Sequence, residues 1–238
     1  MKKKKNIFRR IIFFCLILFV CYIAFQFVYP DVSRLKKENP KRTSFMEYRE
    51  NEWKREGKNY RVKQMWVSYN KISPYLKKAV IISEDDKFYS HEGFDYEAIE
   101  KAIEKDIKAK KFKLGASTIS QQLAKNLYLS PEKTPLRKIR EAILTWRLEN
   151  TLSKKRILEI YLNVAEWGDK GIFGIEAASR KYFGKSASDL TADEAARLAC
   201  VLPNPRRYNP TGSSRYVEKR SGFIYRVMEK RGIVVPDY

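Results

Sequence analysis

The sequence predicts a mostly α-helical domain that follows one membrane-spanning helix. Apolar residues dominate positions 11–29 with no charge among them, and in the rest of the chain they recur every three or four positions. Ser or Thr stands at the start of several of these periodic segments. This spacing places apolar side chains on one face of a helix, and Ser and Thr are preferred N-cap residues. With 238 residues, the chain can hold one well-cored domain, with room for two lobes.

The apolar run at residues 11–29 predicts a membrane anchor. About 19 helical residues at 1.5 Å each cross a hydrocarbon core of about 30 Å. The run is longer than the apolar part of a signal peptide and no A-x-A site follows it, which favours an uncleaved anchor over a removed signal. Basic residues are denser before the run than directly after it, which predicts a cytoplasmic N-terminus and a folded domain outside. The expected segments are a basic tail at 1–10, the anchor at 11–29, a juxtamembrane linker at 30–42 and a domain at 43–238.

The formal charge of +21 indicates an anionic partner, which can be nucleic acid, a bilayer surface or a phosphorylated substrate. The anchor favours the last two. A single histidine leaves one candidate for a His-based metal site or catalytic triad. Two of the three cysteines lie in the predicted anchor, so no disulfide framework is expected.

The first helix of interest follows Ser73 and Pro74, a typical N-cap and first-turn pair. It should extend toward Ser83, which places Glu84 at or just beyond its end, where a carboxylate can face a cleft and transfer a proton. Residues 95–113 predict a charged surface helix whose thin core stripe is Ile99, Ile103 and Ile107; the alternative is a basic flank that contacts anionic lipid.

The segment after Gly115 predicts a helix with two distinct faces. Ile119, Leu123 and Leu127 should face the core. Polar residues form a second line that is free to bind an anion, because the positive helix N-terminus lies near Ser117 and Thr118 and Lys125 adds a full charge two turns later. The members of this line and its neighbours are Ser117, Gln121, Lys125, Thr118 and Gln122. An ordinary capped surface helix is the alternative.

The next helix begins at Thr134 and Pro135, and its predicted core stripe is Leu136, Ile139, Ile143 and Trp146. A neighbouring face carries a carboxylate beside two cations, at Glu141, Arg137 and Lys138. The alternative is a simple surface ion pair at i,i+4 spacing.

The remaining segments predict further helices. Ser153 should begin a helix with core residues at Ile157, Ile160, Tyr161 and Val164. Glycines at 168, 171 and 174 predict a tight turn before a helix at 175–182. Thr191 and Glu194 form a capping box that opens a helix to Val201, and the last helix should cover 216–230 and end near Gly232.

Several ordered motifs resemble one enzyme family. They are E-D-x-x-F-x-x-H-x-G at 84–93, G-x-S-T-I-x-Q-Q-L-x-K-N at 115–126, R-K-x-x-E at 137–141, K-x-x-I-L-E-x-Y-L-N at 154–163 and Y-F-G-K at 182–185. From residue 43 to about 231, the chain resembles the peptidoglycan glycosyltransferases of glycosyltransferase family 51, in their monofunctional, membrane-anchored form. The resemblance implies a mostly helical, lysozyme-like domain of two lobes, the smaller of which faces the membrane.

The resemblance also implies an activity, the polymerisation of lipid II into glycan strands by inverting transfer with release of undecaprenyl pyrophosphate. By position, Glu84 resembles the general base that deprotonates the acceptor 4-hydroxyl, and Glu141 the second carboxylate near the leaving pyrophosphate. Lys133 stands where relatives often carry arginine. The implied substrate-binding residues are Asp85, Ser117, Thr118, Gln121, Gln122, Lys125, Asn126, Lys133, Arg137 and Lys138.

No cofactor is expected to be required, although Mg or Mn can bind the substrate pyrophosphate in this family. The implied partners are lipid II, the growing glycan chain, membrane lipids and other cell-wall synthesis proteins, with no nucleic acid. Two S-x-x-K matches begin at Ser33 and Ser68, but no later S-D-N or K-T-G accompanies them, so no transpeptidase is expected. A lytic enzyme of lysozyme-like fold and a membrane-tethered nucleic-acid-binding or scaffold protein are the rival classes.

Overall fold

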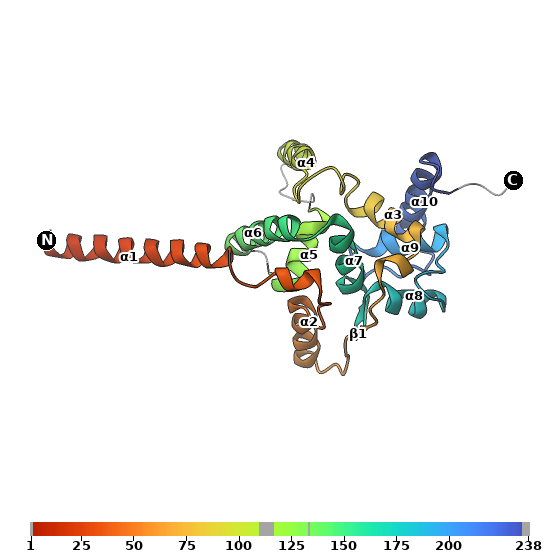
Figure 1. Ribbon diagram of the computed structural model, residues 1–238, viewed down its shortest axis with the longest axis horizontal. Helices are drawn as coiled ribbons and strands as arrows, with labels where there is room; N and C mark the ends of the chain where they lie inside the picture. The colour runs from red at the N-terminus through yellow and green to blue at the C-terminus, as the bar shows by residue number, and fades with distance from the viewer. Residues whose placement is uncertain (1, 110–116, 133, 235–238) are drawn as a thin grey trace.

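The computed structural model describes residues 2–109, 117–132 and 134–234, which are mostly helical as predicted (Figure 1). The α-helices are α1 Lys2–Gln26, α2 Ser44–Arg55, α3 Pro74–Glu84, α4 Tyr96–Ala109, α5 Ile119–Tyr128, α6 Pro135–Thr151, α7 Lys154–Val164, α8 Ile175–Phe183, α9 Ala192–Val201 and α10 Arg215–Lys230. Two 3-10 turns are η1 Ser33–Lys36 and η2 Tyr69–Lys71, and the strands are β1 Lys63–Gln64, β2 Glu166–Gly168 and β3 Ile172–Phe173.

Helix α1 projects away from the rest of the protein as a single rod (Figure 1). Its segment Asn6–Gln26 is long and apolar enough to cross a membrane. The helix ends at Gln26, so residues 27–29 of the predicted anchor follow it in a turn. Arg147 of α6 donates a hydrogen bond to the Gln26 carbonyl at 3.0 Å and thereby fixes the point where the helix ends.

The segment between the anchor and α2 packs against the domain. Val32 and Leu35 are buried in the main core cluster. Arg156 of α7 donates to the Leu35 and Glu38 carbonyls at 2.8 and 2.9 Å. The predicted linker at 30–42 is therefore held in place along its length, so the anchor is joined to the domain by a fixed segment.

The core joins two groups of helices. Helices α3, α9 and α10 pack on one another, while α5 packs against α2, α6 and α7 (Figure 1). The apolar faces predicted for α5 and α7 are buried, as are Ala195, Ala199 and Val201 on α9. This arrangement places the end of α3 next to the polar face of α5.

A small sheet lies beside α7 and α8. Strand β1 is parallel to β3, and β2 is antiparallel to β3, in the order β1-β3-β2. The turn predicted from the glycines is present, since Gly171 has a φ of +87° and a Cβ there would lie 2.2 Å from the Arg61 carbonyl oxygen. The strands themselves were not predicted, because two or three residues carry too little periodicity.

Helix termini follow the predicted caps with one exception. Thr134, Ser153 and Thr191 each accept a hydrogen bond from a backbone N–H in the first turn. Ser73 precedes α3, but its hydroxyl donates to the Leu190 carbonyl at 2.9 Å and does not cap the helix.

The core stripe predicted for α6 was wrong. Leu136, Ile139 and Trp146 are 41%, 44% and 51% exposed, and only Ile143 of the four is buried. The face turned inward instead carries Glu141, Leu144, Thr145 and Leu148. The buried face can be polar because Arg137 and Lys138 compensate the charge of Glu141, and on the exposed face Trp146 packs edge to face against Phe27 just after α1.

The core stripe predicted for α4 is not buried at its two described positions. Ile103 is exposed and Ile99 is only partly buried, while the side chain of Ile107 and residues 110–113 lie outside the described part of the chain.

Candidate active site

Glu84 is the last residue of α3 and lies in a hydrogen-bonded chain that joins three helices. Its Oε2 accepts a hydrogen bond from Gln122 Nε2 on α5 at 3.0 Å. The Gln122 Oε1 in turn accepts from the hydroxyl of Tyr161 on α7 at 2.9 Å. Ser83 Oγ donates to the other carboxylate oxygen of Glu84 at 3.2 Å. These contacts hold the carboxylate in one orientation.

The surroundings of Glu84 suit a proton acceptor. Burial raises the pKa of its carboxyl group, and the hydrogen bonds from Gln122 and Ser83 and the charges of Arg220 and Lys125 oppose this rise. A carboxylate with a raised pKa binds a proton more readily than an exposed one. The Glu84 carboxylate is therefore able to accept a proton from a bound ligand.

Asp85, the residue after Glu84, forms hydrogen bonds with two other segments of the chain. Its side chain is buried, its Oδ2 accepts from the Ile119 N–H at 2.9 Å, and its Oδ1 lies 2.8 Å from His91 Nε2. Because His91 Nδ1 accepts from the Gly93 N–H, a neutral His91 ring donates from Nε2 to Asp85. Asp85 therefore links the end of α3 to the start of α5. Its position does not support the direct substrate contact predicted for it.

The start of α5 is occupied by a reciprocal cap. Thr118 Oγ1 accepts from the Gln121 N–H at 3.2 Å, and Gln121 Oε1 accepts from the Thr118 N–H at 3.0 Å. The Thr118 hydroxyl also donates to the Gly93 carbonyl at 2.7 Å. Both side chains are buried and their oxygens are engaged in this cap, while substrate contact at these two positions stays a prediction. Ser117, one residue earlier, is exposed.

A cationic cluster surrounds Glu141 on α6. The Glu141 side chain is buried, accepts from Arg137 Nη1 at 2.6 Å and also bonds the Lys138 ammonium. Arg137 Nε is buried without a hydrogen-bond partner among the residues that the structure describes. The sequence correctly predicted that this carboxylate and its two cations share one face, and Arg137 keeps a donor for a ligand.

Lys125 on α5 lies in electrostatic range of both carboxylates. Burial lowers the pKa of Lys125, and the Arg137 and Lys138 charges lower it further, while Glu141 and Glu84 raise it. In the described part of the chain Lys125 has no ion-pair partner within 4 Å, so its ammonium can meet an anion between Glu84 and Glu141.

Arg220 on α10 is a site residue that the sequence did not reveal. Its Nη2 donates to the Ser83 carbonyl at 3.0 Å, one residue before Glu84, and its charge lowers the pKa of Glu84. It stands 137 positions from Ser83 in the chain, in a helix that reads as an ordinary amphipathic segment.

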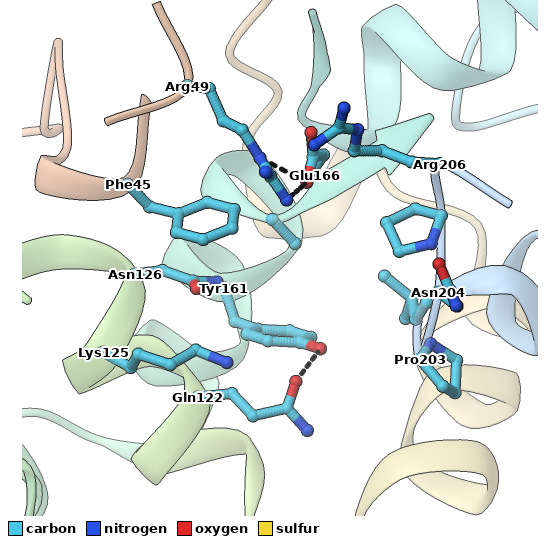
Figure 2. A pocket seen from close by; sticks show the side chains of 13 residues that line it. Phe45, Arg49, Gln122, Lys125, Asn126, Tyr161, Glu166, Pro203, Asn204 and Arg206 are labelled. Atoms are coloured by element: carbon cyan, nitrogen blue, oxygen red, sulfur yellow. Dashed lines mark hydrogen bonds and ion pairs between the residues drawn. The ribbon is translucent and has the colours of Figure 1, made fainter. Parts of the chain in front are cut away.

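A cavity of about 210 Å³ opens beside Gln122 and Tyr161 (Figure 2). Two of its wall residues, Arg49 of α2 and Glu166 of β2, form an ion pair at 2.9 Å. Arg206 forms a second pair, with Glu52, also at 2.9 Å. Burial raises the pKa of Glu166, and the Arg49 charge opposes the rise. None of these residues was predicted. Asn126, which was predicted to bind substrate, also lines this cavity.

Two further predictions are a substrate contact at Lys133 and a divalent cation on the bound substrate. Lys133 lies outside the described residues. Among the described residues, no group of three or more His, Cys, Asp or Glu is placed to hold a metal ion. A divalent cation on a bound ligand therefore stays an untested prediction.

Comparison with known proteins places the site in a family context. Residues 50–229 match the family model described as Transglycosylase. A protein named biosynthetic peptidoglycan transglycosylase from Nitrosospira multiformis is 44% identical, over 93% of this chain and 94% of the relative. Proteins with the same name from Methylobacillus flagellatus and Dechloromonas aromatica are 46% and 51% identical; the matches cover 92% and 78% of this chain and 95% and 80% of the relatives.

Proposed function

Because the chain belongs to the transglycosylase family, we propose that it polymerises lipid II by inverting transfer, with Glu84 as general base and undecaprenyl pyrophosphate as leaving group. The chain is a peptidoglycan transglycosylase, and the transglycosylase domain is the one domain matched along it. The proposal concerns the substrate, the stereochemistry and the roles of individual residues.

The first half of the reaction needs a base. The acceptor 4-hydroxyl loses its proton as its oxygen attacks the anomeric carbon of the lipid-linked chain. The proton passes to Glu84, whose carboxylate is held by Gln122 and Ser83. A positioned base of this kind contributes a rate factor of about 10² to 10⁴.

The second half needs stabilisation of a departing anion. As the bond between the anomeric carbon and the phosphate oxygen breaks, negative charge develops on the pyrophosphate. Lys125 and Arg137 are placed to meet this charge, and Glu141 holds Arg137 and Lys138 in position. Inversion requires the hydroxyl and the pyrophosphate on opposite sides of the carbon. The position of Lys125, in range of both Glu84 and Glu141, supports a reacting centre between the two carboxylates.

One observation carries the proposal: a partly buried Glu84, fixed by Gln122 and Tyr161, faces the same helix α5 that presents Lys125 to Glu141. The test is polymerisation of purified lipid II by Glu84→Gln protein, with glycan separated by size. Turnover should fall by about 10² to 10⁴ while lipid II binding persists. Asp86→Asn is the matched control, because this exposed neighbour pairs only with Arg231 in the described residues.

Two results would contradict the proposal. Near-normal turnover by folded Glu84→Gln protein would assign the base to another group. Shortening of preformed glycan by the wild-type protein, without polymerisation, would identify a hydrolase.

We also propose that α1 is a single-pass anchor in the cytoplasmic membrane, with the N-terminus inside and the domain outside. The lysines at positions 2–5 before the apolar span support this orientation. The proposed partners are lipid II, the growing glycan, membrane lipids and other cell-wall synthesis proteins. A Ser90→Cys variant tests the orientation, since Ser90 is exposed. An impermeant maleimide should label it from the outer side of right-side-out membrane vesicles, and labelling only after lysis would reverse the orientation.

A further inference from the structure

A second cavity, called here the β2–β3 pocket, opens at the turn between strands β2 and β3. Its volume is about 300 Å³. The wall is formed by residues of β1, of this turn, of α8 and of the segment 205–209. The Y-F-G-K motif begins at Tyr182 on this wall, and the glycines at 168 and 171 flank the turn. Neither feature has a part in the reaction proposed above.

The wall of the β2–β3 pocket is strongly cationic. Five cations and one carboxylate line it: Lys63, Lys170, Lys181, Arg206, Arg207 and Asp169. Arg206 is compensated, since it pairs with Glu52 at 2.9 Å and lies 3.9 Å from Asp169. The side chains of the three lysines form no ion pair or hydrogen bond within the described residues. Unpaired cations that surround one cavity favour an anionic ligand, and carboxylates and phosphates are the usual partners of lysine.

The local backbone holds two of these wall residues in place. Lys170 has a φ of 58°, in the left-handed region that lysine rarely adopts. Strained residues of this kind persist where the surrounding structure fixes them, and they are common at ligand sites. A Cβ at Gly168 would lie 1.9 Å from the Tyr182 hydroxyl oxygen, so the glycine leaves the space that this hydroxyl occupies.

The Tyr182 hydroxyl is available to a ligand. It has no hydrogen-bond partner in the part of the chain that the structure describes. Burial raises the pKa of Tyr182, and the Asp169 charge raises it further, so the hydroxyl keeps its proton. A protonated hydroxyl can donate a hydrogen bond to an anion. The pocket therefore offers a neutral donor in addition to its lysines.

The β2–β3 pocket lies beside the cavity that Gln122 lines. Pro205 and Arg206 belong to the walls of both cavities. Strand β2 also joins them, since Glu166 at its start lines the first cavity and Asp169 just after its end lines the second. Three residues along the chain place these two backbones at most about 11 Å apart. An extended pentapeptide, which is the length of the stem of lipid II, spans up to about 17 Å and can reach from one cavity to the other.

Resting on the polymerase function proposed above, we propose that the β2–β3 pocket binds the carboxylates of the lipid II peptide stem, with Lys63, Lys170 and Lys181 as their cationic partners. The stem presents its terminal carboxylate and that of an acidic residue. The Tyr182 hydroxyl donates a further hydrogen bond to one of them. The sugar chain stays in the neighbouring cavity, and the β2–β3 pocket selects substrate by the charge of its peptide.

The test compares two forms of purified lipid II as substrates of the full-length protein in detergent at about 0.15 M salt. One form keeps the carboxylates of its stem, and in the other form they are converted to amides. Wild-type kcat/KM should be about ten-fold lower for the amide form, because each exposed ion pair contributes a few-fold to binding. Lys63→Gln/Lys181→Gln should lower kcat/KM about ten-fold for the carboxylate form and leave it unchanged for the amide form.

A matched control removes the same charge elsewhere. Lys78 on α3 and Lys219 on α10 are also exposed, have no partner among the described residues and lie outside the β2–β3 pocket. Lys78→Gln/Lys219→Gln should leave kcat/KM unchanged for both forms. Calorimetry with the lipid-free disaccharide-pentapeptide measures binding without turnover. The control variant should bind it as tightly as the wild type does, and the pocket variant about ten-fold more weakly.

The outcomes separate this inference from the function on which it rests. Equal wild-type kcat/KM for the two forms would overturn the pocket assignment and leave the polymerase function in place. A pocket variant that loses turnover equally on both forms would show that its lysines meet another anion, and equal losses in the control variant would show attraction by net charge alone. Either result would also overturn the assignment. Failure of the wild-type protein to polymerise either form would refute the proposed function and, with it, the assignment of the pocket to this peptide.

Discussion

Arg147 on α6 should determine whether the membrane anchor is rigidly attached to the domain. Only 8% of this residue is exposed, and its guanidinium donates to three backbone carbonyls at and just after the end of α1. The distances are 3.0 Å to Gln26, 2.8 Å to Val28 and 2.6 Å to Pro30. Arg147→Met keeps most of the aliphatic stem but removes all three bonds. The expected result is an anchor that no longer has a fixed position on α6.

The structure gives the size of this effect. Hydrogen bonds with a charged partner contribute about 1.5 to 3 kcal/mol each. Val28 is exposed, so freed carbonyls there regain water and the three contributions do not add in full. We expect a loss of about 2 to 4 kcal/mol for holding the anchor against α6. That loss lowers the ratio of attached to detached anchor by about 30-fold or more.

Turnover of lipid II in bilayer vesicles and in detergent micelles measures this effect. Arg147→Met should reduce turnover in vesicles, where the anchor sets the position of the cleft relative to the bilayer, and should leave turnover in micelles nearly unchanged. Arg226→Met is the matched control, because Arg226 is exposed on α10. Equal losses in vesicles and micelles would show that Arg147 supports the fold of the domain, and unchanged turnover in both would refute the reasoning.

Three further predictions concern the catalytic residues and the sheet. Because burial raises the pKa of Glu84 above its usual 4.5, kcat/KM should fall as the pH drops through that raised pKa. Arg220→Met removes a charge that lowers this pKa, so the fall in kcat/KM should move to higher pH. An unchanged pH profile would show that Arg220 does not influence the pKa of Glu84. Lys125→Met should reduce lipid II turnover with little change in melting temperature, and a large melting loss with normal turnover per folded molecule would make Lys125 structural. Gly171→Ala should lower the melting temperature strongly, since the new Cβ would meet the Arg61 carbonyl at 2.2 Å, and an unchanged melting temperature would contradict the strained turn.

The sequence predicted best where local chemistry decides the structure. Helices α6, α7 and α9 begin at predicted caps, because a Ser or Thr side chain and a nearby N–H are enough to fix a helix start. Glu84 at the end of α3 and the Arg137–Glu141 pair one turn apart were predictable for the same reason. Contacts between distant segments were not predictable. Arg49 and Glu166 are 117 positions apart, and the residues around each give no indication that the two side chains form a pair.

The failed stripe on α6 shows what periodicity leaves undetermined. Spacing of three and four identifies an apolar face, but it does not say whether that face meets the domain core or the membrane anchor. On α6 the core side carries Glu141 and Thr145, which the pattern reads as polar, and the apolar row of Leu136, Ile139 and Trp146 lies on the exposed side, where Trp146 meets Phe27 after α1. A buried carboxylate is stable there because Arg137 and Lys138 compensate its charge. One side of α6 thus carries Glu141, Arg137 and Lys138 toward the proposed reacting centre, and its apolar row faces outward, where Trp146 meets the segment after α1. The cations proposed to meet the pyrophosphate and the arginines that hold the end of α1 therefore belong to the same helix.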